Sequence, residues 1–285
     1  MATDVKISVA LVTRNRPESL ARCLASLRAQ SVQPFEIVIS DDSNQVEAAK
    51  INRQLALKWK CRYIEGPKRG LYANRNHVAL ACQGTHIRTV DDDHTFPQGH
   101  FERCIEAVKS EPHFIWTTGE ISIFSGRVIG RAETANQLEP AGVGGPVHCL
   151  DDNWAIADGS TIYPAEIFRR GWFMVEEFGY GSSYLEFGAY LYRLGFHSRC
   201  LKGELVEHQH DTITNPNRNP EPDFASYLFA SLCYNLFFKP NRLIAARYLA
   251  SYFWHARFDR KIVLGWPRLI RLAKSRWEES DGNKF

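Results

Sequence analysis

The sequence predicts an α/β fold with a mostly parallel central sheet covered by helices on both faces. Two observations predict it. Short apolar runs of strand length alternate with segments of helical period over residues 5–90, and several of these runs end in polar residues. Strands that alternate with helices are typical of parallel sheets, because a parallel pair needs a crossover connection that packs on a face of the sheet.

The elements follow in close succession along the first 100 residues. Alternating apolar residues predict a strand at 5–11, and Pro17 then begins a segment with Leu20, Cys23, Leu24 and Leu27 at helical spacing. The further strands expected are 35–42, 62–64 and 87–90, and the further helices are 45–58 and 71–82. In the less regular second half we expect a mobile loop at 142–146, a strand at 154–158 and a helix at 183–195.

Composition indicates an ordinary globular chain. Of the 285 residues, 44% are hydrophobic and 24% are charged, which excludes a disordered class, and the net charge of +3 does not indicate nucleic acid as a partner. We expect one domain over 1–215, with a division near residue 100, and a helical extension over 216–285. The seven cysteines lack metal-binding spacing and read as free thiols, and no signal peptide or apolar stretch of 18 residues is present. We therefore expect a cytoplasmic protein.

Three aspartates, Asp91, Asp92 and Asp93, follow the strand at 87–90 directly, and His94 comes next. Like charges so close together repel one another, and a divalent cation would relieve that repulsion. Carboxylates suit Mg²⁺ or Mn²⁺, and an added imidazole favours Mn²⁺. The alternative is a solvated acidic turn that caps a helix beginning near Gln98.

Two other segments carry groups suited to a nucleotide. Asp42 follows the second strand, where a carboxylate can accept the N3–H of a uracil ring, although an Asp-Asp-Ser-Asn run is also typical of a plain turn. Arg69, Arg75 and Asn76 lie between a loop and a helix, where guanidinium groups can bind diphosphate oxygens, or can form a solvated basic helix face. Ligands of open α/β sheets bind at the carboxyl ends of the strands, so these groups are expected to converge.

Taken together, these segments resemble the family 2 glycosyltransferases. The resemblance rests on VALVTRNRPESLARCLASL, FEIVISDDSN, RGLYANRNHVAL and HIRTVDDDHTF, and it returns at IADGSTIYPAEIFRRGWF and FGYGSSYLEFGAYLYRLGF, about two-thirds of the chain in all. It implies the Rossmann-like nucleotide-diphospho-sugar transferase fold of the GT-A type. Residues 1–100 would then form the nucleotide-binding half of the domain, and 101–215 the acceptor half.

The resemblance also implies an activity and its residues. A hexosyl group would pass, with inversion, from a nucleoside diphosphate, expected to be UDP, to a glycan, lipid-linked or small-molecule acceptor, as in polysaccharide biosynthesis. Mn²⁺ or Mg²⁺ would be the cofactor. The implied nucleotide contacts are Thr13, Arg14, Asp42, Arg75, Asp91 and Asp92, and the implied metal ligands are Asp91, Asp93 and His208.

The chain departs from the family pattern in two places. Arg14 stands where the family usually has Tyr, so a guanidinium face would replace aromatic stacking on the base. The usual Gly-Glu-Asp, whose carboxylate acts as general base, is replaced by Gly181-Ser182-Ser183-Tyr184. Neither Ser nor neutral Tyr is an effective base near pH 7. The candidates for the base are therefore Glu186, Asp158 and Glu177. Glu186 is favoured because its position keeps the second acidic residue of the family's helix start.

The end of the chain is basic and aromatic. Between Asn241 and Trp277 nine Lys or Arg residues stand against one acid, Asp259, and the aromatic residues among them include Tyr248, Tyr252, Phe253, Trp254, Trp266 and Trp277. This pattern is typical of helices that lie on an anionic membrane surface, and equally of helices that pack on a domain with a solvated basic face. Peripheral membrane contact, at the inner face of a membrane, is therefore one of two interpretations.

Overall fold

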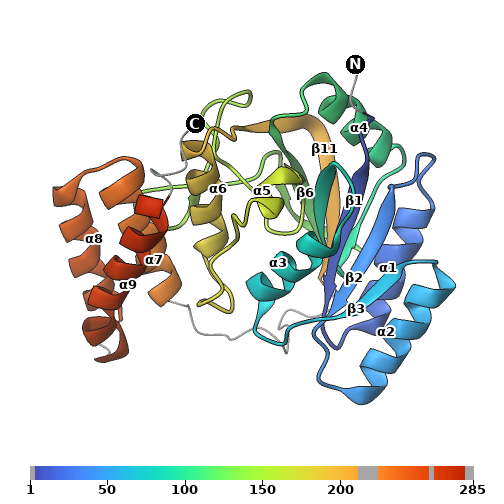
Figure 1. The fold of residues 1–285 in the computed structure, drawn as a ribbon, viewed down its shortest axis with the longest axis horizontal. Coiled ribbons are helices and arrows are strands. Elements are labelled where there is room, and N and C mark those ends of the chain that lie inside the picture. Colours follow the sequence, from blue (N-terminus) through green and yellow to red (C-terminus); the bar gives the residue numbers. More distant parts are fainter. Residues whose placement is uncertain (1–3, 211–223, 257–259, 280–285) are drawn as a thin grey trace.

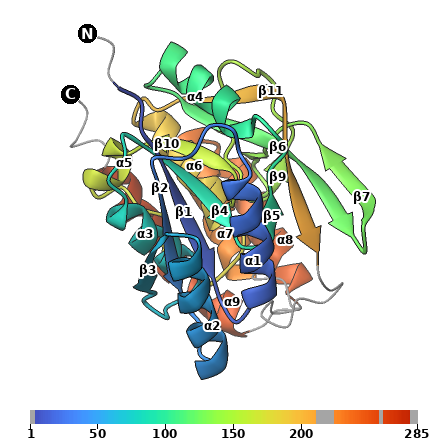
Figure 2. The ribbon, with the colours of Figure 1, turned by 90° about the vertical axis from the view of Figure 1, so that its right-hand side faces the viewer.

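A computed structural model describes residues 4–210, 224–256 and 260–279. Its centre is a curled sheet with the strand order β3-β2-β1-β4-β10-β6-β11-β5, and β7 pairs with β6 (Figures 1 and 2). The bounds are β1 Ile7–Thr13, β2 Glu36–Asp41, β3 Arg62–Glu65, β4 His86–Asp91, β5 His94–Thr95, β6 Ile115–Phe124, β7 Arg127–Ala132, β10 Thr161–Pro164 and β11 Ser198–His210. This is the expected α/β architecture.

The first four strands are parallel, and helices join them as the sequence predicts. α1 spans Pro17–Arg28, α2 Val46–Lys58 and α3 Leu71–Ala81, and β1 pairs in parallel with both β2 and β4. In the second half the sheet is mixed, because β10 runs antiparallel to both β4 and β6 whereas β11 runs parallel to β6. The segments from which nucleotide contacts are expected thus lie on the regular part of the sheet.

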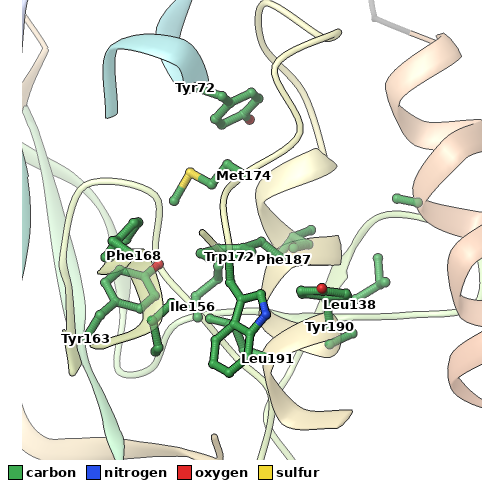
Figure 3. Packing of buried hydrophobic residues seen from close by; sticks show 14 of the residues in the cluster. Tyr72, Leu138, Ile156, Tyr163, Phe168, Trp172, Met174, Phe187, Tyr190 and Leu191 are labelled. Atoms are coloured by element: carbon green, nitrogen blue, oxygen red, sulfur yellow. The ribbon is translucent and has the colours of Figure 1, made fainter. Parts of the chain in front are cut away.

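Two hydrophobic clusters cover the two faces of the sheet. Ile7, Val9 and Leu11 of β1 pack against α1 and against α4, His100–Ser110. Ala10 and Val12 belong to the other cluster, with α3, α5 at Glu166–Arg169 and α6 at Ser183–Arg193. Within that second cluster Trp172 lies near Phe187, Tyr190 and Leu191 (Figure 3). All seven residues of β1 are therefore buried, including those between the alternating apolar positions that predicted the strand.

Two expectations for the second half were wrong. Residues 154–158 form no strand: Ile156 makes only an isolated bridge to Asn136, and the chain then bends at Asp158, whose backbone oxygen accepts a hydrogen bond from Arg75. Residues 142–146 are not a mobile loop, since β9 (Gly144–Gly145) pairs with β8 (Gln137–Leu138). The adjoining turn presses so closely on a helix that a Cβ on Gly142 would lie 2.0 Å from the Tyr227 backbone oxygen.

Helices at the end of the chain form a layer beyond α6, on the side away from the sheet (Figure 1). They are α7 at Phe224–Cys233, a π-helical turn at Tyr234–Phe238, α8 at Arg242–His255 and α9 at Arg260–Glu279. The expected domain boundary at residue 215, and Asp259 of the basic tail, lie outside the described residues. None of the described helices combines the length and the apolar character needed to cross a membrane.

Candidate active site

The polar strand ends converge as expected. Thr13 and Asp41 end β1 and β2 and are paired in register, and Asp91 at the end of β4 lies opposite Val12. Parallel strands bring their carboxyl ends to one edge of the sheet, where no further strand residue covers them. The acidic run and Asp42 therefore belong to the same edge.

Asp42 lies in a buried corner of this edge. Its Oδ1 accepts a hydrogen bond from the backbone nitrogen of Lys68 at 2.8 Å, and a Cβ on Gly66 would lie 2.2 Å from the same oxygen. Burial raises the pKa of Asp42, while the Lys68 N–H and the nearby charge of Arg14 act in the opposite direction. Arg14 is thus near enough to Asp42 to lower its pKa, and the contact of both residues with a nucleobase stays a prediction.

Arg75 joins two carboxylates of the site. Its Nη2 donates to both oxygens of Asp91, at 2.7 and 2.9 Å. Its Nε lies 3.1 Å from Oδ1 of Asp158 but makes no hydrogen bond there, so this contact is an ion pair only. Arg75 is 1% exposed. The geometry therefore supports a role in positioning Asp91 and Asp158, and its contact with a diphosphate stays a prediction.

Asp92 is buried and contacts two residues at the end of β1. Its Oδ2 accepts from the Thr13 hydroxyl at 2.7 Å, and its Oδ1 lies 3.2 Å from Nη2 of Arg16. Asp92 is buried, and this burial raises its pKa even though Arg16 and Thr13 act in the opposite direction. Thr13 and Asp92 therefore hold each other in place, and their expected nucleotide contact stays a prediction.

Asp93, His94 and His208 offer ligand atoms that lie within 4.8 Å of one another. Oδ2 of Asp93 lies 3.3 Å from Nε2 of His208. The imidazole rings of His94 and His208 meet edge to face, with their centroids 5.1 Å apart. A carboxylate and imidazoles are groups that coordinate divalent first-row metal ions. The expected pair Asp93 and His208 is thus brought together, whereas Asp91 belongs to no such group among the described residues.

His208 carries positive charge within this cluster. Burial would lower the pKa of His208, but hydrogen bonds with Asp93 and Glu120 outweigh it and raise the pKa to about 10. Burial would likewise raise the pKa of Asp93, yet the hydrogen bond from His208 and the charges of His94 and Arg16 hold it below its usual range. The imidazolium of His208 is therefore the positive partner of the Asp93 and Glu120 carboxylates.

The three candidate bases lie in different surroundings. Asp158 lies beside Arg75 at the site, in the loop whose Gly159 approaches Asp91 and His94. Glu177 is exposed and pairs with Arg268 of α9. Glu186 is 0% exposed.

Glu186 is committed to the C-terminal helices. It accepts from Arg276 Nε at 2.8 and 2.9 Å and from the Trp277 indole nitrogen at 2.9 Å. These contacts leave the carboxylate no access to an acceptor hydroxyl, so the geometry favours Asp158 over the residue that the sequence favoured.

Sequence reasoning missed two residues of this site. Arg16 pairs with Asp93 at 2.7 Å, and its position next to the Thr13-Arg14-Asn15 strand end was the available signal. Glu120 of β6 accepts from Nδ1 of His208 at 3.0 Å. No sequence signal pointed to Glu120, because it stands within a strand and meets β11 only through the folding of the sheet.

Comparison with known proteins decides the family. The sequence model described as Glycosyl transferase family 2 matches residues 8–168, which is more than half of the chain. The chain belongs to glycosyl transferase family 2. This family 2 member is 31% identical over 121 residues to the uncharacterized glycosyltransferase YwdF of Bacillus subtilis (strain 168), a match that covers 42% of the chain and 44% of YwdF.

A second relative of this family 2 chain is the glycosyltransferase GlyA of Streptococcus pneumoniae serotype 4 (strain ATCC BAA-334 / TIGR4), 28% identical over 109 residues, or 38% of the chain and 16% of GlyA. The chain therefore matches less than half of the length of either curated relative. Because these matches are partial, the activity and substrates of this protein are proposed from its site and not taken from the relatives.

Solved structures agree on the fold. GalNAc-T7, crystallised with UDP, GalNAc and Mn²⁺, superposes with a TM-score of 0.67 at 14% identity, over 84% of this chain and 49% of that one. S. aureus TarS 1-349 in complex with UDP-GlcNAc superposes with a TM-score of 0.62 at 16% identity, over 96% of this chain and 81% of the TarS chain. The family 2 chain thus has the GT-A-type fold.

Proposed function

We propose that this family 2 protein is a metal-dependent glycosyltransferase that moves a hexosyl group from a UDP-sugar to a hydroxyl of an acceptor, with inversion. The acceptor is a glycan, a lipid-linked sugar or a small molecule. The single observation that carries the proposal is the cluster of Asp93, His94 and His208 at the carboxyl edge of the sheet, where β2 also ends at the Asp42 corner. Family membership makes this cluster part of a transferase fold.

The donor groups fit a divalent metal. Asp93 and His208 would hold Mn²⁺ or Mg²⁺, with His94 the third group in reach. When bound, the ion supplies positive charge to the diphosphate oxygens and stabilises the leaving nucleotide. Two of the structural neighbours were crystallised with UDP and Mn²⁺ or with UDP-GlcNAc, which supports a UDP-sugar as donor.

Three residues would serve the donor and the acceptor. Asp42, with Arg14 beside it, would bind the uracil ring at the end of β2. Asp158 would take the proton of the acceptor hydroxyl as that oxygen attacks the anomeric carbon. Arg75 would keep the Asp158 carboxylate in place through their ion pair. The general base is then supplied from the loop before β10, in place of the family's helix start.

An interaction with an anionic membrane would bring a lipid-linked acceptor to this enzyme. Leu243, Arg247 and Trp254 lie on one exposed stripe of α8, and Leu243 and Trp254 are 85% and 72% exposed. Exposed arginines accompany them, Arg242 on α8 and Arg271 on α9. Apolar and aromatic side chains next to cations suit the boundary between headgroups and acyl chains.

A thermal-shift screen tests the proposal. The melting temperature of the wild-type chain and of Asp93→Ala would be measured with UDP and UDP-sugars, with and without Mn²⁺, because a ligand of the folded state raises it by mass action. We expect Mn²⁺-dependent stabilisation by UDP in the wild type and none in Asp93→Ala. Asp151→Ala, which removes an exposed carboxylate outside the site, is the control.

Two results would contradict parts of the proposal. UDP stabilisation of equal size with and without Mn²⁺ would contradict the metal site. Binding of UDP-sugars without transfer to any acceptor would indicate a binding module that has lost catalysis, a reading that the Ser182-Ser183 replacement favours.

A further inference from the structure

We infer that Glu120 is the residue that positions His208 for metal binding, an inference that rests on the proposed metal site. Glu120 lies outside every segment that suggested the function, on β6, yet it is one of the two carboxylates that hold the His208 ring. Nδ1 of His208 lies 3.0 Å from Oε1 of Glu120, and Nε2 lies 3.3 Å from Oδ2 of Asp93. The imidazole is thus held between a carboxylate on each side.

The two nitrogens of the ring have different surroundings. Nε2 lies 3.3 Å from Oδ2 of Asp93 in the metal cluster, while Nδ1 faces the carboxylate of Glu120 on β6. When Nε2 ligates a metal ion, Nδ1 keeps its hydrogen and donates it to Glu120. A carboxylate that accepts from the second nitrogen fixes the tautomer and the orientation of a ligating histidine, and makes it a better ligand.

The sheet fixes the position of Glu120 itself. β6 and β11 are parallel, with Ser122 opposite His208, so Glu120 and His208 are diagonal neighbours on adjacent strands. The Ser122 hydroxyl donates to Oε1 of Glu120 at 3.1 Å. On its other side the His208 ring meets His94 at 5.1 Å. The carboxylate and the ring are therefore placed by two hydrogen-bonded strands rather than by a loop.

A competing arrangement uses the same residues. Glu120, His208 and His210 also offer ligand atoms within 4.8 Å of one another, so Glu120 would there be a ligand and not a positioning group. Both arrangements need His208, and its Nδ1 cannot donate to Glu120 and ligate an ion at the same time. Asp93 would be a ligand only in the first arrangement and His210 only in the second. Variants of these two residues therefore distinguish the two arrangements.

The test measures Mn²⁺ affinity in the presence of UDP, by the loss of the electron paramagnetic resonance signal of free Mn²⁺. Glu120→Ala removes the acceptor, and we expect it to weaken Mn²⁺ binding about 10- to 100-fold, the usual effect of losing such a partner. Glu120→Gln keeps an acceptor oxygen, so its loss of Mn²⁺ affinity should be clearly smaller than that of Glu120→Ala. Glu133→Ala, an exposed carboxylate just beyond the same hairpin, should change nothing. Melting temperatures without ligand show whether each variant folds.

Each result decides between the alternatives. Wild-type Mn²⁺ affinity in folded Glu120→Ala would overturn the inference, as would equal losses in Glu120→Ala and Glu120→Gln, because a positioning role requires partial rescue. A loss in His210→Ala as large as that in Glu120→Ala would show that the ion binds the competing set. Unchanged affinity in His208→Ala would instead overturn the metal site of the proposed function, which keeps the two failures distinguishable.

Discussion

Arg75 and Asp91 are joined by two hydrogen bonds from one guanidinium nitrogen to both carboxylate oxygens, at 2.7 and 2.9 Å. Arg75 lies at the carboxyl edge of the sheet and is almost completely buried. The same guanidinium pairs with Asp158. Burial of a charge is costly unless it is paired, so the three groups depend on one another. This ion-paired triad ties α3 to the end of β4 and to the loop before β10.

Replacing Arg75 should therefore cost stability as well as activity. We expect Arg75→Leu to lower the free energy of unfolding by about 3 to 5 kcal/mol, because it leaves two partly buried carboxylates without their cation. Arg53→Leu, which breaks an exposed pair with Glu65, should cost less than about 1 kcal/mol. Urea denaturation measures both variants, and equal losses would contradict the structural role of the triad.

Asp42 should decide which nucleobase the protein prefers. Asp42→Asn replaces a group that only accepts hydrogen bonds with one that also donates them, so the contact with uracil N3–H should weaken by about 1 to 3 kcal/mol. Preference for UDP over other nucleoside diphosphates should fall accordingly, measured by calorimetry on each diphosphate. A variant that retains the wild-type preference would show that another group recognises the base.

Asp158 should carry the proton transfer. In single-turnover experiments with saturating donor, Asp158→Asn should react about 10² to 10⁴ times more slowly while the affinity for UDP stays near that of the wild type. Glu177→Gln and Glu186→Gln should keep the wild-type rate when assayed well below their melting temperatures. Glu186→Gln should melt earlier, since Arg276 would lose its buried anionic partner.

The same single-turnover experiment separates the candidates for the general base. A slow Glu186→Gln enzyme with normal stability would return the role to the residue that the sequence favoured. Full activity in all three variants would favour a base supplied by the acceptor, or a retaining mechanism.

His100 should make stability depend on pH. Its Nε2 lies 3.1 Å from the Arg88 guanidinium, which can only donate, so Nε2 is unprotonated, and Nδ1 lies 3.2 Å from Glu204. Burial lowers the pKa of His100 from 6.5 to about 4, although the contact with Glu204 acts in the opposite direction. The unfolded chain therefore takes up a proton below about pH 6.5 that the native protein resists until about pH 4.

The sign follows from this difference in proton uptake. Between about pH 6.5 and 4 the unfolded state binds more protons, so stability falls as the pH falls. We expect His100→Gln, which can still accept from Arg88 and donate to Glu204, to flatten this decline by about 1 to 3 kcal/mol in urea denaturation. His197→Gln, a change in a more exposed ring, is the control. An unchanged slope in His100→Gln would show that other groups cause the decline.

Membrane contact should depend on the exposed stripe of α8. The double variant Leu243→Ser, Trp254→Ser should lose sedimentation with vesicles that contain anionic lipid, and the wild type should lose it as salt is added, because charge attraction is screened. Leu57→Ser is the matched control, since that leucine is also exposed, at 74%, but lies on α2. Equal binding to neutral and anionic vesicles would contradict the charge-based attachment.

The sequence determined the repeating βα half and the positions of its polar strand ends. Leu20, Cys23, Leu24 and Leu27 are the apolar residues that α1 buries, because helical period alone places them on one face. Asp42 and Asp93 were identified from the strand pattern instead. Residues that follow a buried strand lie at the carboxyl edge of the sheet. Local patterns suffice where the structure repeats with a fixed period.

Only the tertiary structure decided which of the polar residues meet. Asp93 and His208 lie far apart in sequence and come together because β11 pairs with β5 and with β6, the strand that brings Glu120 to the same ring. Glu186 was misjudged for the converse reason. Its α6 position is the one expected, but Arg276 and Trp277 dock on it from the end of the chain. Pairing across long loops leaves no periodic trace in the sequence, so no local pattern predicts it.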